Sequence, residues 1–354
     1  MARPKMLYGM QVGRGLAAML VVLFHTTVAL SSRGLAPAFP QGAAGVDIFF
    51  VISGFVIYLT GRKLAWREFF ARRIARVVPL YWFFLTLKLG VILWLGNDPT
   101  RSIDDPLFVI GSYLFIPVFR ESMGGVYPLI VAGWTLNYEM YFYLVTAIVL
   151  GVLPRRHFPL GLTVYMVAAA LVSLFLRDRI SPESAPPIVL LEPLCLEFIA
   201  GLWIAVLWTR GMAPSRWLAA ICVGIGVLSL VLMPGEHAGT PTRIVYWGIP
   251  AAAIVFGLVN LEPFVGFRHW GPALVIGDAS YSIYMAHTAV LPVLDILVRR
   301  MPANGLLQGA TLLVGSALAG VVVWRVIERP LTDLASRLLR LHVRNPAPQS
   351  ATSA

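Results

Sequence analysis

Two ionisable side chains, Arg14 and His25, stand at either end of an apolar segment near the start of the chain. In a helix that turns by about 100° per residue, their spacing leaves them only about 20° apart in direction and about 16 Å apart along the axis. The apolar residues continue to Leu30, so the segment can cross a bilayer with His25 well inside it. Ionisable groups at such depth usually face the protein interior and have a function, so we expect both residues to be functional.

A second predicted span begins near Ala43 and carries Asp47 in its first turns. At a rise of about 1.5 Å per residue, Asp47 lies at nearly the same depth as His25, towards the outer surface. A carboxylate beside a histidine fixes its tautomer and raises its basicity, as a general base requires. The sequence therefore predicts a catalytic pair of His25 and Asp47, with a purely structural pair as the alternative.

A cluster of arginines precedes the third span. Arg72, Arg73 and Arg76 recur at about one-turn intervals just ahead of Pro79 and Tyr81. Guanidinium groups in this arrangement can bind the phosphates of a ligand bidentately. On spacing alone, an ordinary positively charged anchor at the membrane surface is the simpler interpretation.

The fourth predicted span contains Trp134, Asn137 and Glu139. Glu139 lies close to the expected midplane, where a carboxylate needs a partner. It either pairs with an arginine, in a structural ion pair, or lines a passage through the protein.

The segment from Gly277 to His287 resembles the start of a helix, with Asp278 or Ser280 as its N-cap. One face of this helix carries Ser280, Tyr284 and His287. That face either lines a polar channel or forms hydroxyl-mediated contacts with a neighbouring helix.

The composition identifies a polytopic membrane protein: 58% of residues are hydrophobic, 13% are charged, and the mean hydropathy is +0.78. Soluble domains average about 25% charged residues. The net charge of +11 comes from Lys and Arg in short loops between apolar segments, which is typical of a cytoplasmic face and not of nucleic-acid binding. Cys195 and Cys222 lie inside apolar segments and indicate neither a disulfide framework nor a metal site.

The fold class that follows is all-α, a bundle of about ten transmembrane helices. The predicted spans lie near residues 11–30, 43–60, 77–96, 128–152, 159–176, 187–208, 216–233, 243–260, 280–298 and 305–327. The apolar piece from Leu107 to Pro117 is too short to span. We interpret 11–30 as a retained span, not a signal peptide, because no small-x-small cleavage site follows. We expect one domain over 1–341 and a disordered tail over 342–354, rich in Pro, Ala and Ser.

The charges of the loops predict how the chain is oriented across the membrane. The loop between the second and third spans carries six basic residues against Glu68 alone: Arg62, Lys63, Arg67, Arg72, Arg73 and Arg76. This loop should be cytoplasmic, which places both termini in the cytoplasm and the long 97–127 loop outside. Arg33 and the pair Arg299 and Arg300 run against this bias.

Together these segments resemble the acyltransferase-3 family of integral-membrane acyltransferases, in particular its exopolysaccharide-production branch. The matching segments are Arg14 with His25, Gly45 to Ile57, Phe70 to Tyr81, Trp134 to Glu139, Ser280 to His287, and Glu328-Arg-Pro330. Their order and their spread over nearly the whole chain make the match specific. One departure is Asp278, where the family often has a basic residue before its Ser-Tyr motif.

The resemblance implies an O-acyltransferase of the bacterial cytoplasmic membrane that moves an acyl group, usually acetyl from acetyl-CoA, to a sugar hydroxyl of a cell-surface polysaccharide. It makes His25 the essential histidine and Arg14 its partner in the motif, and it gives the acyl-CoA phosphates to Arg73 and Arg76. We expect Asp47 to orient His25 and Arg72 to join the phosphate site. We further expect these side chains to contact substrate or line its channel: Ser53, Trp134, Glu139, Tyr281, Ser282, Tyr284 and His287.

The resemblance thus implies acyl-CoA as the co-substrate, a carbohydrate as the acceptor, and membrane lipid around the helices. We expect no bound cofactor, no metal ion and no nucleic acid. Direct transfer and an acyl-enzyme relay are both open, and the sequence specifies no oligomeric state. Two other function classes remain: a transporter or flippase of a lipid-linked sugar or small solute, whose intramembrane polar groups would form its pathway, and a non-catalytic component of a polysaccharide assembly.

Overall fold

A computed structural model describes residues 7–95, 103, 105–121, 124–176, 179–181, 183–184, 186–212, 214–233 and 242–341. Over these ranges the chain is almost wholly helical, and its only strands are β1 (Phe119–Arg120) and β2 (Gly125–Val126), which pair antiparallel. The helices are α1 Tyr8–Ser31, α2 Gly45–Gly61, α3 Trp66–Leu95, α4 Pro106–Leu114, α5 Trp134–Val152, α6 Phe158–Leu176, α7 Leu196–Thr209, α8 Arg216–Leu232, α9 Ile249–Leu261, α10 Gly271–Asp278, α11 Ser280–Val298, α12 Gly305–Val323 and α13 Arg329–Leu338. Two π-helical turns, Ile244–Gly248 and Trp324–Glu328, lead into α9 and α13. The expected disordered tail, 342–354, lies outside the described residues.

Eight helical stretches in the described part of the chain are long and apolar enough to cross a membrane. Each coincides with a predicted span, and the two other predicted spans coincide with shorter apolar helices, Pro193–Thr209 and Arg216–Leu232. The all-α, multi-pass architecture is thus confirmed, while the cytoplasmic placement of the termini stays a prediction. The third helix begins at Trp66, well before the predicted residue 77, so the arginine cluster lies inside α3.

Several helices expose apolar side chains along one face. These residues recur every three or four positions, the spacing of one helical face; they are Leu160, Val164, Val167 and Leu171 on α6, and Leu218, Ile221, Ile225, Leu228 and Leu232 on α8. Such faces suit contact with lipid hydrocarbon, in agreement with a membrane setting.

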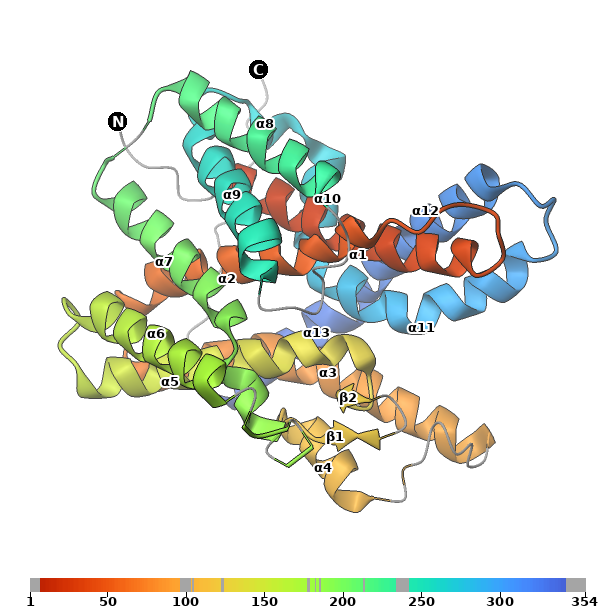
Figure 1. Cartoon of the computed structure of the whole chain (residues 1–354), viewed down its shortest axis with the longest axis horizontal. Helices are drawn as coiled ribbons and strands as arrows, with labels where there is room; N and C mark the ends of the chain where they lie inside the picture. The colour runs from red at the N-terminus through yellow and green to blue at the C-terminus, as the bar shows by residue number, and fades with distance from the viewer. Residues whose placement is uncertain are drawn as a thin grey trace.

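Helices α1 and α2 run through the middle of the molecule (Figure 1), with α8, α9 and α10 on one side and α3, α5 and α6 on the other. Helix α1 contacts α2, α9, α10, α11 and α12, while α2 contacts α3, α5, α7 and α9. The two helices that carry His25 and Asp47 are therefore enclosed by neighbours on several sides.

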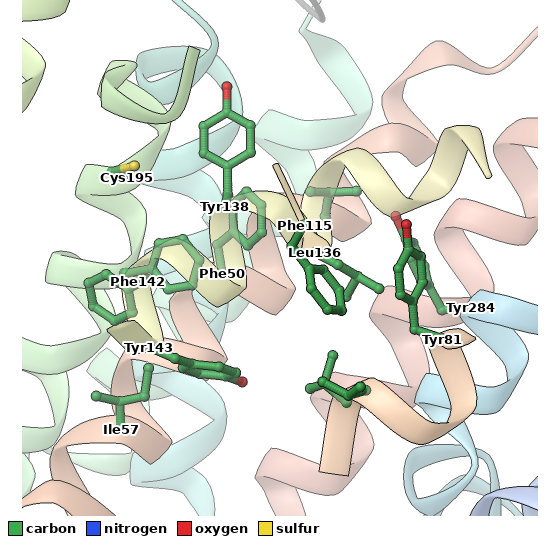
Figure 2. Packing of buried hydrophobic residues seen from close by; sticks show 14 of the residues in the cluster. Phe50, Ile57, Tyr81, Phe115, Leu136, Tyr138, Phe142, Tyr143, Cys195 and Tyr284 are labelled. Carbon is green, nitrogen blue, oxygen red and sulfur yellow. The ribbon is translucent and has the colours of Figure 1, made fainter. Parts of the chain in front are cut away.

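An aromatic cluster joins α2, α5 and α7. The ring of Phe198 stacks on Phe50 at 4.6 Å and on Phe142 at 4.2 Å between centroids, and Tyr138 lies 6.1 Å from Phe50. Figure 2 shows Phe50, Tyr138 and Phe142 packed close to Cys195, a buried free cysteine. This cluster holds α5 against the central helices.

Helices α2 and α7 cross in backbone contact at Gly54 and Gly201. A Cβ atom at Gly54 would lie 1.8 Å from the carbonyl oxygen of Phe198, and one at Gly201 would lie 1.8 Å from that of Val51. Close approach of two backbones at small residues is a common way for membrane helices to associate.

Gly54→Ala and Gly201→Ala should therefore each push α2 and α7 apart. Overpacking typically costs about 1–3 kcal/mol, and a collision with backbone has little room to relax, so we expect the upper end of that range. The thermal midpoint of the detergent-solubilised protein and its membrane abundance measure the effect. Gly224→Ala on α8 is the matched control, because a Cβ there meets nothing within 4 Å. Equal stability of all three variants would contradict the close crossing.

Candidate functional site

A cavity of about 170 Å³ lies between α1, α2, α3, α5 and α11. Its polar wall is formed by Arg14, Ser53, Arg73, Arg76, Thr135, Glu139, Tyr143, Tyr281 and Tyr284. Apart from Thr135 and Tyr143, all of these were expected from the sequence to be site residues. Residues from five helices, far apart in the chain, thus meet at one place.

The cavity is strongly cationic on one side. Arg14, Arg73 and Arg76 all line it, and Glu139 is the one carboxylate in its described lining. Glu139 accepts hydrogen bonds from Ser53 Oγ at 3.1 Å and from the Tyr143 hydroxyl. Three guanidinium groups facing a single carboxylate leave an excess of positive charge, which suits an anionic ligand.

Arg73 is held in place by its neighbours. Its Nη2 donates to Thr60 Oγ1 at 2.8 Å, and its guanidinium lies 5.6 Å from the ring centroid of Tyr143 and 5.4 Å from that of Phe69. Its buried Nε has no hydrogen-bond partner. A ligand oxygen in the cavity would supply one.

Arg14 connects the cavity to α10. Its Nη1 donates to Gln11 Oε1 at 3.3 Å, and Gln11 Nε2 donates to Asp278 Oδ1 at 3.0 Å. Burial raises the pKa of the Asp278 carboxyl, and the positive charges of Arg14 and Arg76 act against this rise. The expected cap is wrong: α11 begins at Ser280 with no side-chain cap, because the Asp278 carboxylate binds Gln11 instead.

Arg72 is not among the residues that line the cavity. Its Nε and Nη2 bind Glu68 Oε1 at 3.1 and 2.7 Å, one turn earlier on α3, and its side chain is 38% exposed. The phosphate contact expected for Arg72 is therefore not supported, because its charge is directed to a carboxylate outside the cavity. Arg73 and Arg76 are the members of the cluster that face inward.

The expected pairing of His25 with Asp47 is wrong. Asp47 is fully buried, and its two oxygens accept hydrogen bonds from Arg243 Nε at 2.9 Å and Nη2 at 2.7 Å. The Arg243 guanidinium also lies 4.7 Å from the ring centroid of Trp247 and 5.8 Å from that of Trp134. A buried carboxylate is best compensated by a full positive charge, which a neutral imidazole does not supply.

His25 instead meets a second histidine. Its ring centroid lies 4.9 Å from that of His287 on α11, and the ring of Tyr284, which lines the cavity, lies 5.7 Å from His287. His25 does not line the cavity; it contacts His287, whose ring lies beside Tyr284 of the cavity wall.

Two more expected site residues lie behind the cavity wall. Trp134 packs its ring 5.8 Å from that of Tyr138, and Ser282 donates to the buried Glu328 at 2.6 Å. Neither lines the cavity, so the structure places them in supporting positions.

Some residues of the site were not found from the sequence. Tyr143 follows Glu139 by one helical turn, so helical spacing could have identified it as a neighbour. Arg243 offered no such signal, because an arginine just ahead of an apolar helix normally marks the membrane surface. Within the described ranges, no three His, Cys, Asp or Glu residues are grouped closely enough to hold a metal ion.

Comparisons with known proteins identify the family of the chain. The profile of the acyltransferase-3 family, described as an acyltransferase domain, matches residues 7–327. The chain is similar to the exopolysaccharide production protein ExoZ of Rhizobium meliloti, with 32% identity over 306 residues, 83% of this chain and 90% of that protein. No solved structure matches the chain.

Two more distant relatives are also similar. The chain is 26% identical over 345 residues to the putative membrane-bound transacylase BcsY of Komagataeibacter xylinus, covering 92% of this chain and 82% of that one. It is 23% identical over 366 residues to the O-acetyltransferase OatA of Staphylococcus aureus, covering 94% of this chain and 58% of that protein. The chain thus spans little more than half the length of the staphylococcal relative.

Proposed function

We propose that this chain, which belongs to the acyltransferase-3 family, transfers an acyl group, acetyl in the first instance, from cytoplasmic acyl-CoA to a sugar hydroxyl of a cell-surface polysaccharide. Family membership makes the chain a membrane O-acyltransferase. The proposal adds three points to family membership: acyl-CoA is the donor, a sugar hydroxyl of a polysaccharide is the acceptor, and the protein lies in the bacterial cytoplasmic membrane. The acceptor class follows from the similarity to the exopolysaccharide production protein ExoZ.

The observation that carries the proposal is the convergence of Arg14, Arg73 and Arg76 on one cavity. Acyl-CoA has phosphates at one end and a thioester at the other, joined by a flexible chain. If the phosphates of acyl-CoA bind Arg73 and Arg76, its thioester would extend along α1 from Arg14 towards His25, a rise of about 16 Å. In this proposal the binding arginines and the candidate base stand at the two ends of the bound acyl-CoA.

His25 then acts as the general base. It takes the proton from the acceptor hydroxyl while that oxygen attacks the thioester carbonyl; the C–O bond forms, the C–S bond breaks, and the proton passes to the departing thiolate. In the acyl-enzyme route, His25 first accepts the acyl group and then yields it to the hydroxyl. Both routes need an imidazole that is unprotonated on the reacting nitrogen.

The test of this function is the ester-linked acyl content of the surface polysaccharide, measured by proton NMR in a deletion strain with and without the wild-type gene. We expect deletion to remove the acyl signal and the gene to restore it. If deletion instead stops polymer export and leaves acylation per sugar unchanged, the chain is a transporter and the proposal fails.

Arg73→Gln and Arg76→Gln should each raise the KM for acyl-CoA by about 10- to 100-fold, since a hydrogen bond to a charged group contributes about 1.5–3 kcal/mol. Initial rates with isotopically labelled acetyl-CoA in isolated membranes measure this effect. Arg72→Gln is the matched control, being on the same helix but bound to Glu68, and should stay within about twofold of wild type. A KM that rises equally in all three variants would show a general surface-charge effect and contradict the phosphate site.

A further inference from the structure

We infer that His287 is the positioning partner of His25: it accepts a hydrogen bond from one imidazole nitrogen of His25 and so leaves the other nitrogen unprotonated towards the acceptor hydroxyl. This inference rests on the proposed function. It assigns to His287 the orienting contact that the sequence predicted for Asp47.

The first observation is the state of the His287 ring. His287 is 2% exposed; backbone groups of Ile283 and Tyr284, one turn earlier, lie close to its ring, but neither ring nitrogen is paired with a side chain. Leaving a buried polar group unpaired costs about 1–3 kcal/mol, so a histidine in this position needs a polar partner. The imidazole of His25 lies against it, with centroids 4.9 Å apart and ring planes at 34°.

The second observation is that α1 and α11 are held in register along their contact. Ala18 and Val22 on α1 cluster with Ala279 and Ile283 on α11. Beyond the histidines, Arg33 Nη2 binds Asp295 Oδ1 at 2.9 Å. Arg33, just past the end of α1, and Asp295 on α11 each follow the histidine of their segment by about two turns. The two helices therefore run parallel, and contacts on both sides keep the two imidazoles facing.

Two other polar groups already have partners. The Tyr284 hydroxyl donates to the Ala132 carbonyl oxygen at 2.8 Å and lies 2.9 Å from Thr135 Oγ1. Asp47 is bound by Arg243 through both oxygens. We therefore assign the orienting contact to His287, whose ring lies against that of His25.

The chemistry follows from the two nitrogens of an imidazole. In the neutral ring one nitrogen donates and the other accepts, and the hydrogen bond made by the first decides which form is present. When His25 takes the acceptor proton, its bond to His287 becomes charge-assisted and stabilises the imidazolium. His287 neither gains nor loses a proton over the cycle.

Three substitutions test this contact. His287→Leu removes both nitrogens, whereas His287→Gln and His287→Asn each place an amide near one ring nitrogen. Each variant is produced as the full chain and assayed in membranes with labelled acetyl-CoA and surface polysaccharide from the deletion strain. Ile283→Val, on the same face of α11, is the control for altered packing.

We expect His287→Leu to lower kcat by about 100-fold with the KM for acetyl-CoA unchanged, and one amide variant to recover to within about tenfold of wild type. Ile283→Val should keep the wild-type rate. The inference is overturned if His287→Leu keeps at least a third of the wild-type kcat, or if both amide variants are as slow as the leucine variant at equal abundance. If the leucine variant does not fold, the two amide variants decide the question.

The failure of this inference differs from the failure of the proposed function. If wild type transfers label and the His287 variants do so equally well, the acyltransferase proposal stands and His287 has no orienting effect. If wild type itself transfers no label, the proposed donor or acceptor is wrong.

Discussion

Replacing His25 by alanine should lower the rate of acyl transfer by about 10²- to 10⁴-fold, the usual contribution of a general base. The loss should appear in kcat, because Arg73 and Arg76, which are proposed to bind the donor phosphates, line the cavity and His25 does not. Stability should change less than on truncation of a core residue, because His25 is only partly buried. Initial rates in membranes and quantitative immunoblotting measure the two quantities separately.

His157→Ala is the matched control for this experiment. His157 is exposed at the start of α6, and its loss should affect neither rate nor abundance. If His25→Ala keeps more than about a tenth of the wild-type rate, the assignment of His25 as the base is wrong. If the rate falls only in proportion to the amount of protein in the membrane, His25 has a structural role instead.

Much of the site could be predicted because a membrane restricts where polar residues can be. Arg14, Arg76 and Glu139 sit within long apolar helices, and such groups face the protein interior because lipid cannot solvate them. Helical periodicity then specifies which residues share a face. These two rules place Arg14 and Glu139 on inward faces, whereas spacing alone favoured a surface anchor for Arg73 and Arg76; all four line the cavity.

The contact partners of His25 and Asp47 could not be predicted in the same way. Depth along the helix placed His25 and Asp47 at one level, but depth does not specify which neighbouring helix each side chain faces. Asp47 faces Arg243, which is 196 residues further along the chain, and His25 faces His287 on α11. Both contacts depend on the packing order of helices, which a single sequence does not encode locally.

The exceptions to the predicted orientation have a structural explanation. Arg33 and Arg299 run against the charge bias of the loops, yet both bind the Asp295 carboxylate, at 2.9 and 2.8 Å. A shared carboxylate partly compensates these two arginines, so they add less net positive charge at that end of the bundle than their number suggests. The sequence offers one sign of this contact, because Asp295 is an acidic residue inside the predicted span at 280–298 and needs a positively charged partner there.

Arg243→Met should destabilise the protein more than any surface substitution, by about 3–5 kcal/mol, because it leaves the Asp47 carboxylate buried without a compensating positive charge. Asp47 is fully buried, and its neighbour Glu197, 1% exposed, is a second carboxyl group that can share a hydrogen bond with it but supplies no positive charge. The thermal midpoint in detergent and the level of protein in the membrane measure the loss.

The double variant Asp47→Leu/Arg243→Met separates a structural pair from a catalytic one. Replacing both members of a buried ion pair by apolar residues is often neutral or stabilising, so we expect the double variant to recover most of the stability lost in Arg243→Met. If acyl transfer recovers with it, the pair serves only to hold α2 against the segment that leads into α9. If stability recovers while transfer stays absent, Asp47 or Arg243 takes part in the reaction, and Asp47 regains the catalytic role that its depth beside His25 first indicated.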